Sequence, residues 1–141
     1  GRVAIAYRDS KWDLAAYYKK AKKDFSPKVG FIQRNNVGET FITTGVHKRF
    51  SSGPFLNLNP YLFINQFDNL DGYMESQAIK MGLDIQFMNG SQLYAGLTQT
   101  KENIKTSFEL YGFDMPTGEY VFNSMSLNYR GDRTRKILEW Y

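Results

Sequence analysis

The chain has 141 residues, 42 % of them hydrophobic, and a formal net charge of +4. Its length fits a single domain, 1–141, with a modest core, and no apolar run approaches the roughly 20 residues of a membrane-spanning helix. The basic residues form no long runs, so the charge alone does not indicate a nucleic-acid partner. Cysteine is absent, which excludes disulfide and thiol chemistry within this chain. A membrane β-barrel is compatible with this composition, because only every second residue of its strands needs to be apolar.

Alternation of apolar and polar residues predicts an all-β, antiparallel up-and-down meander of about eight strands. The predicted strands cover 2–8, 11–20, 39–50, 54–67, the two arms of a hairpin within 73–100, 119–129 and 134–141. Pro60 has no N–H for the ladder, so we expect a bulge or a local gap in pairing there. Both ends of the chain lie in strand-like sequence, and we expect a segment of a larger transmembrane β-barrel.

The clearest predicted element is the hairpin within 73–100, which folds at Asn89-Gly90. This dipeptide predicts a two-residue type I′ turn, whose central residues both need positive φ. The arms alternate strictly, so one face of the sheet is apolar and the other is polar. The apolar face is expected to contact lipid at Leu56, Leu62, Ile79, Leu83, Ile85 and Leu97.

The polar face is the expected interior of the barrel. It should contain a polar network of mixed charge, with a transport path as an alternative role, formed by Asp13, Lys19, Lys80 and Asp84. A neighbouring row resembles either a sugar-stacking surface or a plain barrel wall: Asn57, Asn59, Tyr61 and Phe63.

The predicted connections alternate in length: short, long, short, medium, short, long, short. An up-and-down meander with its tight turns at one end is typical of outer-membrane barrels. The apolar row from Ile79 to Phe87 covers nine residues, close to the roughly 9–11 that a tilted strand needs to cross a bilayer. Lys48 would face lipid unless it lies at the interface, where the cost falls to about 0–1 kcal/mol. Aromatic residues near strand ends would form an interfacial girdle: Tyr7, Trp12, Tyr73 and Tyr129.

No catalytic or metal-binding constellation emerges from the sequence. His47 is the single histidine, so a metal site or a triad built on histidine lacks partners. The carboxylates Glu75 and Asp84 fall on opposite faces of one strand, which argues against an acid/base pair. Arg130-Gly131-Asp132 is interpreted as a turn. We therefore expect a non-catalytic protein with neither metal nor cofactor.

Two motifs lie in the long connections. The first is Asp24-Phe25-Ser26-Pro27-Lys28-Val29-Gly30-Phe31-Ile32-Gln33-Arg34, and the second joins Phe108-Glu109-Leu110 to Met115-Pro116-Thr117-Gly118-Glu119-Tyr120-Val121-Phe122. Over most of the chain, they resemble the C-terminal barrel of a family of outer-membrane proteins of unknown function in Bacteroidota and related bacteria. In that family the barrel follows a family-9-like carbohydrate-binding module, which is absent from this segment.

The motif residues are interpreted as loop architecture, with a ligand site as the alternative: Asp24, Phe25, Pro27, Gly30, Phe31, Arg34, Phe108, Pro116, Gly118 and Tyr120. The resemblance implies a scaffold or channel in the bacterial outer membrane, linked to glycan capture or uptake. Outer-membrane lipid would be its partner, and glycans would bind through the attached module. The alternatives are a soluble β-barrel with a lipid or sugar inside it and an accessory carbohydrate-active enzyme, which could use Asp13 or Asp84.

Overall fold

The computed structural model describes residues 1–21, 36–110, 113–132 and 139–140. These ranges contain no helical segment with the length and apolarity of a membrane span. The strands are β1 (Arg2–Arg8), β2 (Trp12–Ala21), β3 (Val37–Val46), β4 (Lys48–Arg49), β5 (Phe55–Asn69), β6 (Tyr73–Phe87), β7 (Gln92–Ile104), β8 (Phe108–Leu110), β9 (Phe113–Met115), β10 (Gly118–Arg130) and β11 (Glu139–Trp140).

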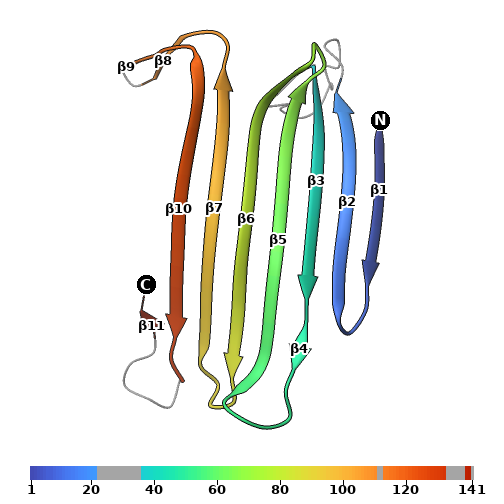
Figure 1. The fold of residues 1–141 in the computed structure, drawn as a ribbon, viewed down its shortest axis with the longest axis vertical. Helices are drawn as coiled ribbons and strands as arrows, with labels where there is room; N and C mark the ends of the chain where they lie inside the picture. The colour runs from blue at the N-terminus through green and yellow to red at the C-terminus, as the bar shows by residue number, and fades with distance from the viewer. Residues whose placement is uncertain (22–35, 111–112, 133–138, 141) are drawn as a thin grey trace, which may run out of the picture.

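The main sheet is an antiparallel meander, which confirms the predicted fold class. Its order is β1-β2-β3-β5-β6-β7-β10-β11, with β4 paired to β5 beside this path (Figure 1). Strands β8 and β9 form a separate two-stranded hairpin. Within the described ranges the sheet is open, because β1 pairs only with β2 and β11 only with β10. Closure into a barrel therefore stays a prediction.

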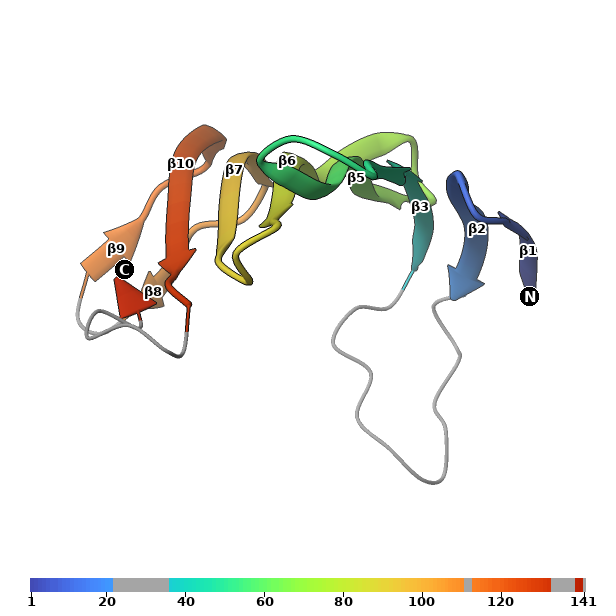
Figure 2. The ribbon, with the colours of Figure 1, turned by 90° about the horizontal axis from the view of Figure 1, so that it is seen from below.

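The pairing register gathers the apolar residues on one face. One row crosses the sheet through Tyr7, Leu14, Thr44, Leu62, Met81, Leu97 and Met125. The sheet curves into an open arch (Figure 2), and its hollow is lined by the polar face. The apolar rows therefore lie on the convex side.

The convex face has no second layer over it among the described residues. Ile5 is 74 % exposed, Leu97 52 % and Met125 79 %, whereas Val37 is the one buried hydrophobic residue in these ranges. The modest core that the chain length suggested is thus absent from the described part. A continuous apolar surface of this kind needs a partner, because large exposed apolar patches mark contacts with protein or membrane.

The structure corrects the turn predicted at Asn89-Gly90. Only Gly90 has positive φ, +85°, so the turn is not type I′. Phe87 N–H donates to the Ser91 carbonyl at 2.9 Å, and Gly90 N–H donates to the Phe87 carbonyl at 3.0 Å. The loop is therefore three residues long, a turn followed by a left-handed glycine, which is the next most common hairpin connection. Asn89 Oδ1 stabilises it by accepting from Ser91 N–H at 3.0 Å and Ser91 Oγ at 2.7 Å.

Two of the predicted connection lengths are also wrong. Strand β5 continues to Asn69 and β6 begins at Tyr73, so the medium connection is as short as the turns at the other end. The predicted loop 101–118 contains the end of β7 and the β8–β9 hairpin. Strands β5 and β7 are longer than predicted because polar residues extend them beyond the apolar alternation.

The irregularity expected at Pro60 is a gap in pairing. Pro60 itself lies opposite Leu83 in regular register, but the strand on its other side stops at Val46 and resumes as β4 at Lys48. The missing N–H of Pro60 accounts for this break. The register shifts between β5 and β6 lie elsewhere, one between Phe55 and Asn57 and one between Phe67 and Asp68. The first leaves Leu56 without the β6 partner that its predicted place in the apolar row requires.

The β1–β2 turn is closed by the carboxylate of Asp9. It accepts hydrogen bonds from Tyr7 Oη at 2.7 Å, Lys11 N–H at 2.7 Å and Trp12 N–H at 2.6 Å. The bond from the Tyr7 hydroxyl, followed by the two backbone bonds, lowers the pKa of Asp9. The resulting stabilisation is present above the unfolded pKa of about 3.9 and is lost as the pH falls through the lower folded pKa.

We therefore expect an NMR titration of the Asp9 carboxyl carbon to give a midpoint below the ordinary value. The Y7F variant, which lacks the strongest donor, should shift this midpoint upward. An identical midpoint in both proteins would contradict the assigned cause.

Candidate functional site: a tyrosine-floored hollow

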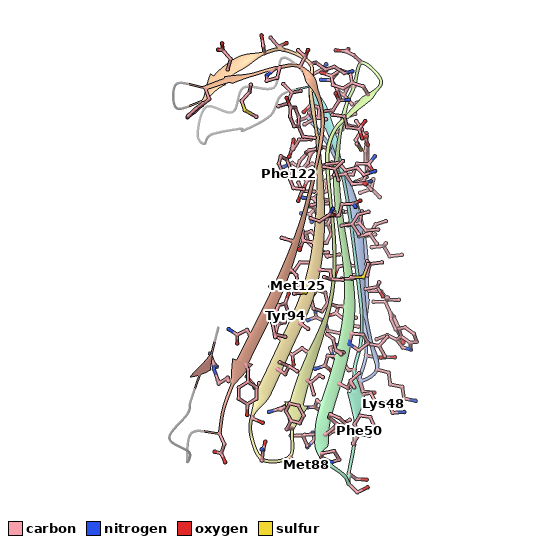
Figure 3. All side chains as sticks on the ribbon, turned by 60° about the vertical axis from the view of Figure 1, so that its left-hand side comes forward. Lys48, Phe50, Met88, Tyr94, Phe122 and Met125 are labelled. Atoms are coloured by element: carbon pink, nitrogen blue, oxygen red, sulfur yellow. The ribbon has the colours of Figure 1, made fainter. Side chains whose placement is uncertain are left out.

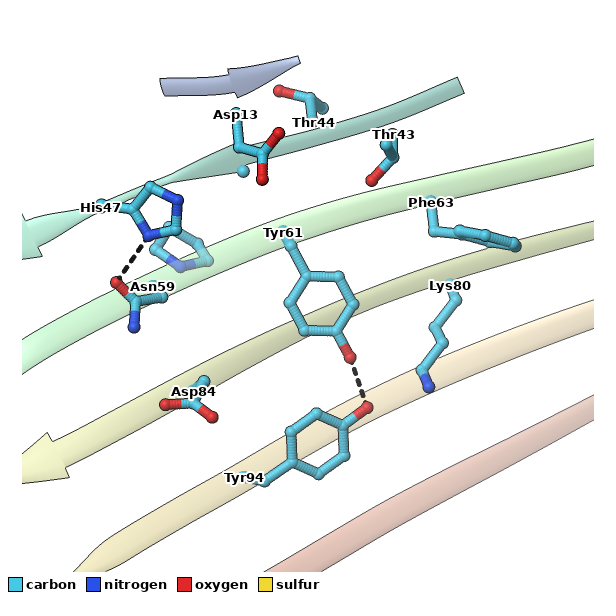
Figure 4. A pocket seen from close by; sticks show the side chains of 12 residues that line it. Asp13, Thr43, Thr44, His47, Asn59, Tyr61, Phe63, Lys80, Asp84 and Tyr94 are labelled. Carbon is cyan, nitrogen blue, oxygen red and sulfur yellow. Dashed lines mark hydrogen bonds between the residues drawn. The ribbon is translucent and has the colours of Figure 1, made fainter. Parts of the chain in front are cut away.

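A hollow of about 670 Å³ lies on the concave face, between the middle of the sheet and the end with the β6–β7 turn. Strands β2, β3, β5, β6 and β7 all contribute to it (Figure 4). Its lining is both aromatic and polar, and it includes the side chains of Asp13, His47, Asn59, Tyr61, Phe63, Lys80, Asp84 and Tyr94.

Two tyrosines form the floor of the hollow. The ring centroids of Tyr61 and Tyr94 are 6.2 Å apart, their planes differ by 18°, and their hydroxyls hydrogen-bond to each other (Figure 4). A Cβ on Gly82 would lie 2.5 Å from Cζ of Tyr61, and a Cβ on Gly96 would lie 2.7 Å from Oη of Tyr94. The tyrosine rings can therefore lie close against the sheet because these two strand positions have no side chain.

Charged and polar groups surround this floor. Lys80 Nζ lies 5.6 Å from the centroid of the Tyr94 ring, and Asp84 lies on the same strand, four residues further along. Asp13 is paired with Arg8 at 2.8 Å. A ring nitrogen of His47 lies 3.1 Å from the side-chain oxygen of Asn59. Donors and acceptors thus stand beside an aromatic surface, an arrangement suited to a ligand with both polar and apolar faces.

A chain of aromatic contacts leads from the hollow toward the opposite end of β2. Phe63 meets Phe41 edge-on at 5.1 Å, and Phe41 stacks on Tyr17 at 4.7 Å. The guanidinium of Arg2 lies 4.6 Å from the Tyr17 ring centroid, and Tyr17 Oη donates to Glu39 at 2.6 Å. Because these rings pack against one another, they stabilise the concave face and do not add further free ring surface to the hollow.

The structure brings together three of the four residues predicted for the lumen network. Asp13, Lys80 and Asp84 line the hollow, whereas Lys19 lies on the same face nearer the other end of β2, opposite Glu39. Tyr61 and Phe63, from the predicted sugar-stacking row, also line it. The alternation of the hairpin also predicted Gly82, Tyr94 and Gly96 on the polar face. It did not assign them to a site, because only the register brings them beside Tyr61.

The predicted loop motifs lie away from the hollow or outside the described residues. The first motif, with Asp24, Phe25, Pro27, Gly30, Phe31 and Arg34, lies wholly outside them. In the second, Phe108 pairs with Met115 in the β8–β9 hairpin, and Gly118 begins β10. The Tyr120 hydroxyl donates to the Pro116 carbonyl at 3.0 Å, which closes the entry to β10.

No group of three His, Cys, Asp or Glu residues that could hold a metal ion occurs in the part of the chain that the structure describes. Comparison with protein-family models, with curated proteins and with solved structures gives no match to this chain. The resemblance to an outer-membrane barrel family therefore stays a prediction.

Proposed function

We propose that this chain is part of the wall of a bacterial outer-membrane β-barrel, which acts as a scaffold or channel in glycan capture or uptake. The observation that carries the proposal is the opposite polarity of the two faces. The convex face is apolar and uncovered in the described ranges, and the concave face is polar and hollowed. Membrane barrels have this arrangement, with an apolar outer band and a polar interior. A soluble barrel with its ligand inside would place the apolar rows on the concave side.

Strand length and end chemistry support the same proposal. Strands β5 and β6 have 15 residues each, and β7 and β10 have 13, more than the roughly 9–11 that a tilted strand needs to cross a bilayer. At one end the apolar band stops at the amide pair Gln66–Gln77, which is hydrogen-bonded at 2.7 Å. At the other end, Lys48 lies 5.5 Å from the ring centroid of Phe50, near the β6–β7 turn (Figure 3). In a membrane barrel this position would suit Lys48, because charges are tolerated at the interface.

The open edges of the sheet also favour a larger closed wall. In the described ranges β1 has one partner, and β10 meets β11 only at Tyr129 and Arg130. Long unpaired edges promote association, and closure into a barrel removes them. Additional strands that pair with these two edges would complete the wall.

Labelling of the full-length protein in outer-membrane vesicles tests the orientation. This chain has no cysteine, so single thiols can be introduced by L83C on the convex face and T98C on the concave face. We expect the L83C thiol to react with a bilayer-soluble alkylating reagent and the T98C thiol with a charged one. Reaction of both thiols with the charged reagent, or recovery of the protein in the soluble fraction, would overturn the proposal.

A further inference from the structure

We propose that the hollow is a binding subsite for a neutral saccharide, in which one pyranose ring lies on the platform made by Tyr61 and Tyr94. The inference deepens the proposed function and rests on it for access of the sugar from the lumen. Each tyrosine ring lies beside a glycine of the sheet, and the planes of the two rings differ by 18°, so together they present a nearly flat aromatic surface on the concave side (Figure 4).

The chemistry of a pyranose ring matches this surface. Its C–H groups form an apolar face that packs on an aromatic ring, while its hydroxyls point outward around the ring edge. Lys80, Asp84 and Asn59 stand around the platform and supply donors and acceptors for those hydroxyls. The hollow, at about 670 Å³, lies in the range of small-ligand sites, roughly 300–1,000 Å³.

The charges favour a neutral ligand. Asp13 is compensated by Arg8 at 2.8 Å, and Lys80 balances Asp84 within the same lining. A cationic ligand on the tyrosine rings would meet Lys80, whose ammonium group already lies 5.6 Å from the Tyr94 ring centroid. An acidic sugar would be attracted by the ammonium group of Lys80 but repelled by the carboxylate of Asp84. The lining therefore offers no net opposite charge to either a cationic or an anionic ligand.

The test is isothermal titration calorimetry on the full-length protein in detergent micelles with neutral hexasaccharides of glucose, xylose and mannose. We expect at least one of them to bind. The Y94A and Y61A variants should each raise the Kd roughly tenfold or more, because stacking on one ring is lost. The Y61F/Y94F double variant keeps both ring faces and should retain binding. The Y18A variant, which removes a tyrosine ring that is 44 % exposed on the convex face, should leave the Kd unchanged.

Several results would overturn the inference: no binding of any hexasaccharide, tighter binding of oligogalacturonate or adenosine than of the neutral sugars, or equal Kd values for Y94A and Y18A. Because a binding module elsewhere in the full-length protein would also take sugars, the Y94A and Y61A comparison decides the site. Thermal unfolding shows whether the alanine variants are folded, and the phenylalanine variant tests the platform if they are not. If the labelling shows that the L83C thiol faces lipid but no sugar binds, only the saccharide subsite is refuted. If a water-soluble protein binds the sugar, only the membrane proposal is refuted.

Discussion

Replacing Met125 by arginine should destabilise the membrane-inserted protein by about 2–4 kcal/mol, the cost of an arginine near the bilayer midplane on the lipid face of a barrel. Met125 is 79 % exposed on the convex face and lies near the middle of the height of β10 (Figure 3). In lipid its exposed surface meets acyl chains, and a guanidinium there has neither water nor a counter-ion. The free energy of unfolding, measured by denaturant titration in vesicles, gives the effect.

The S124R variant is the matched control, because Ser124 is the neighbouring residue on β10 and faces the concave, polar side. Its arginine would enter the wetted interior, and we expect a change within about 1 kcal/mol. Equal effects of the two arginines would contradict the orientation. If the convex face were in water, M125R would behave as an ordinary surface substitution and change stability by about 0.5 kcal/mol or less.

Replacing Gly82 by alanine should lift Tyr61 off the sheet at a cost of about 1 kcal/mol or less, because the half-buried ring can move into the open hollow. The added Cβ would overlap Oη of Tyr61 and lie 2.5 Å from its Cζ and 2.6 Å from its Cε1. These atoms belong to the tip of a side chain, so the ring can rotate away, and its hydrogen bond to Tyr94 would then be lost. Near-UV circular dichroism of the tyrosines and denaturant unfolding measure the two consequences.

Gly45 provides the control in the same cross-strand row. A Cβ at that position would find its nearest atom, the Pro60 carbonyl oxygen, at 3.8 Å, which is ordinary contact. The G45A variant should therefore keep the tyrosine signal and lose little stability. An unchanged signal in G82A would mean that Tyr61 does not depend on the missing side chain.

The fold class and the polarity of each face could be predicted from the order of the residues alone. Alternation is local, since successive side chains of a strand point to opposite sides. Met81 and Asp84 could thus be assigned to opposite faces without knowing their neighbours. The same local information predicted that Lys80, Asp84 and Asp13 share one face, because each strand is amphipathic on its own.

The contacts between residues of different strands could not be predicted in this way, because they form only in the assembled sheet. The contact of Tyr61 with Gly82, and of its hydroxyl with that of Tyr94, depends on the register of three strands. Register is set by long-range pairing and by loop geometry. The loop at Gly90 shows why the sequence was insufficient, because it is one residue longer than the Asn89-Gly90 dipeptide predicted. The curvature of the arch, which made the polar face the hollow one, is likewise a property of the assembled sheet and not of any single strand.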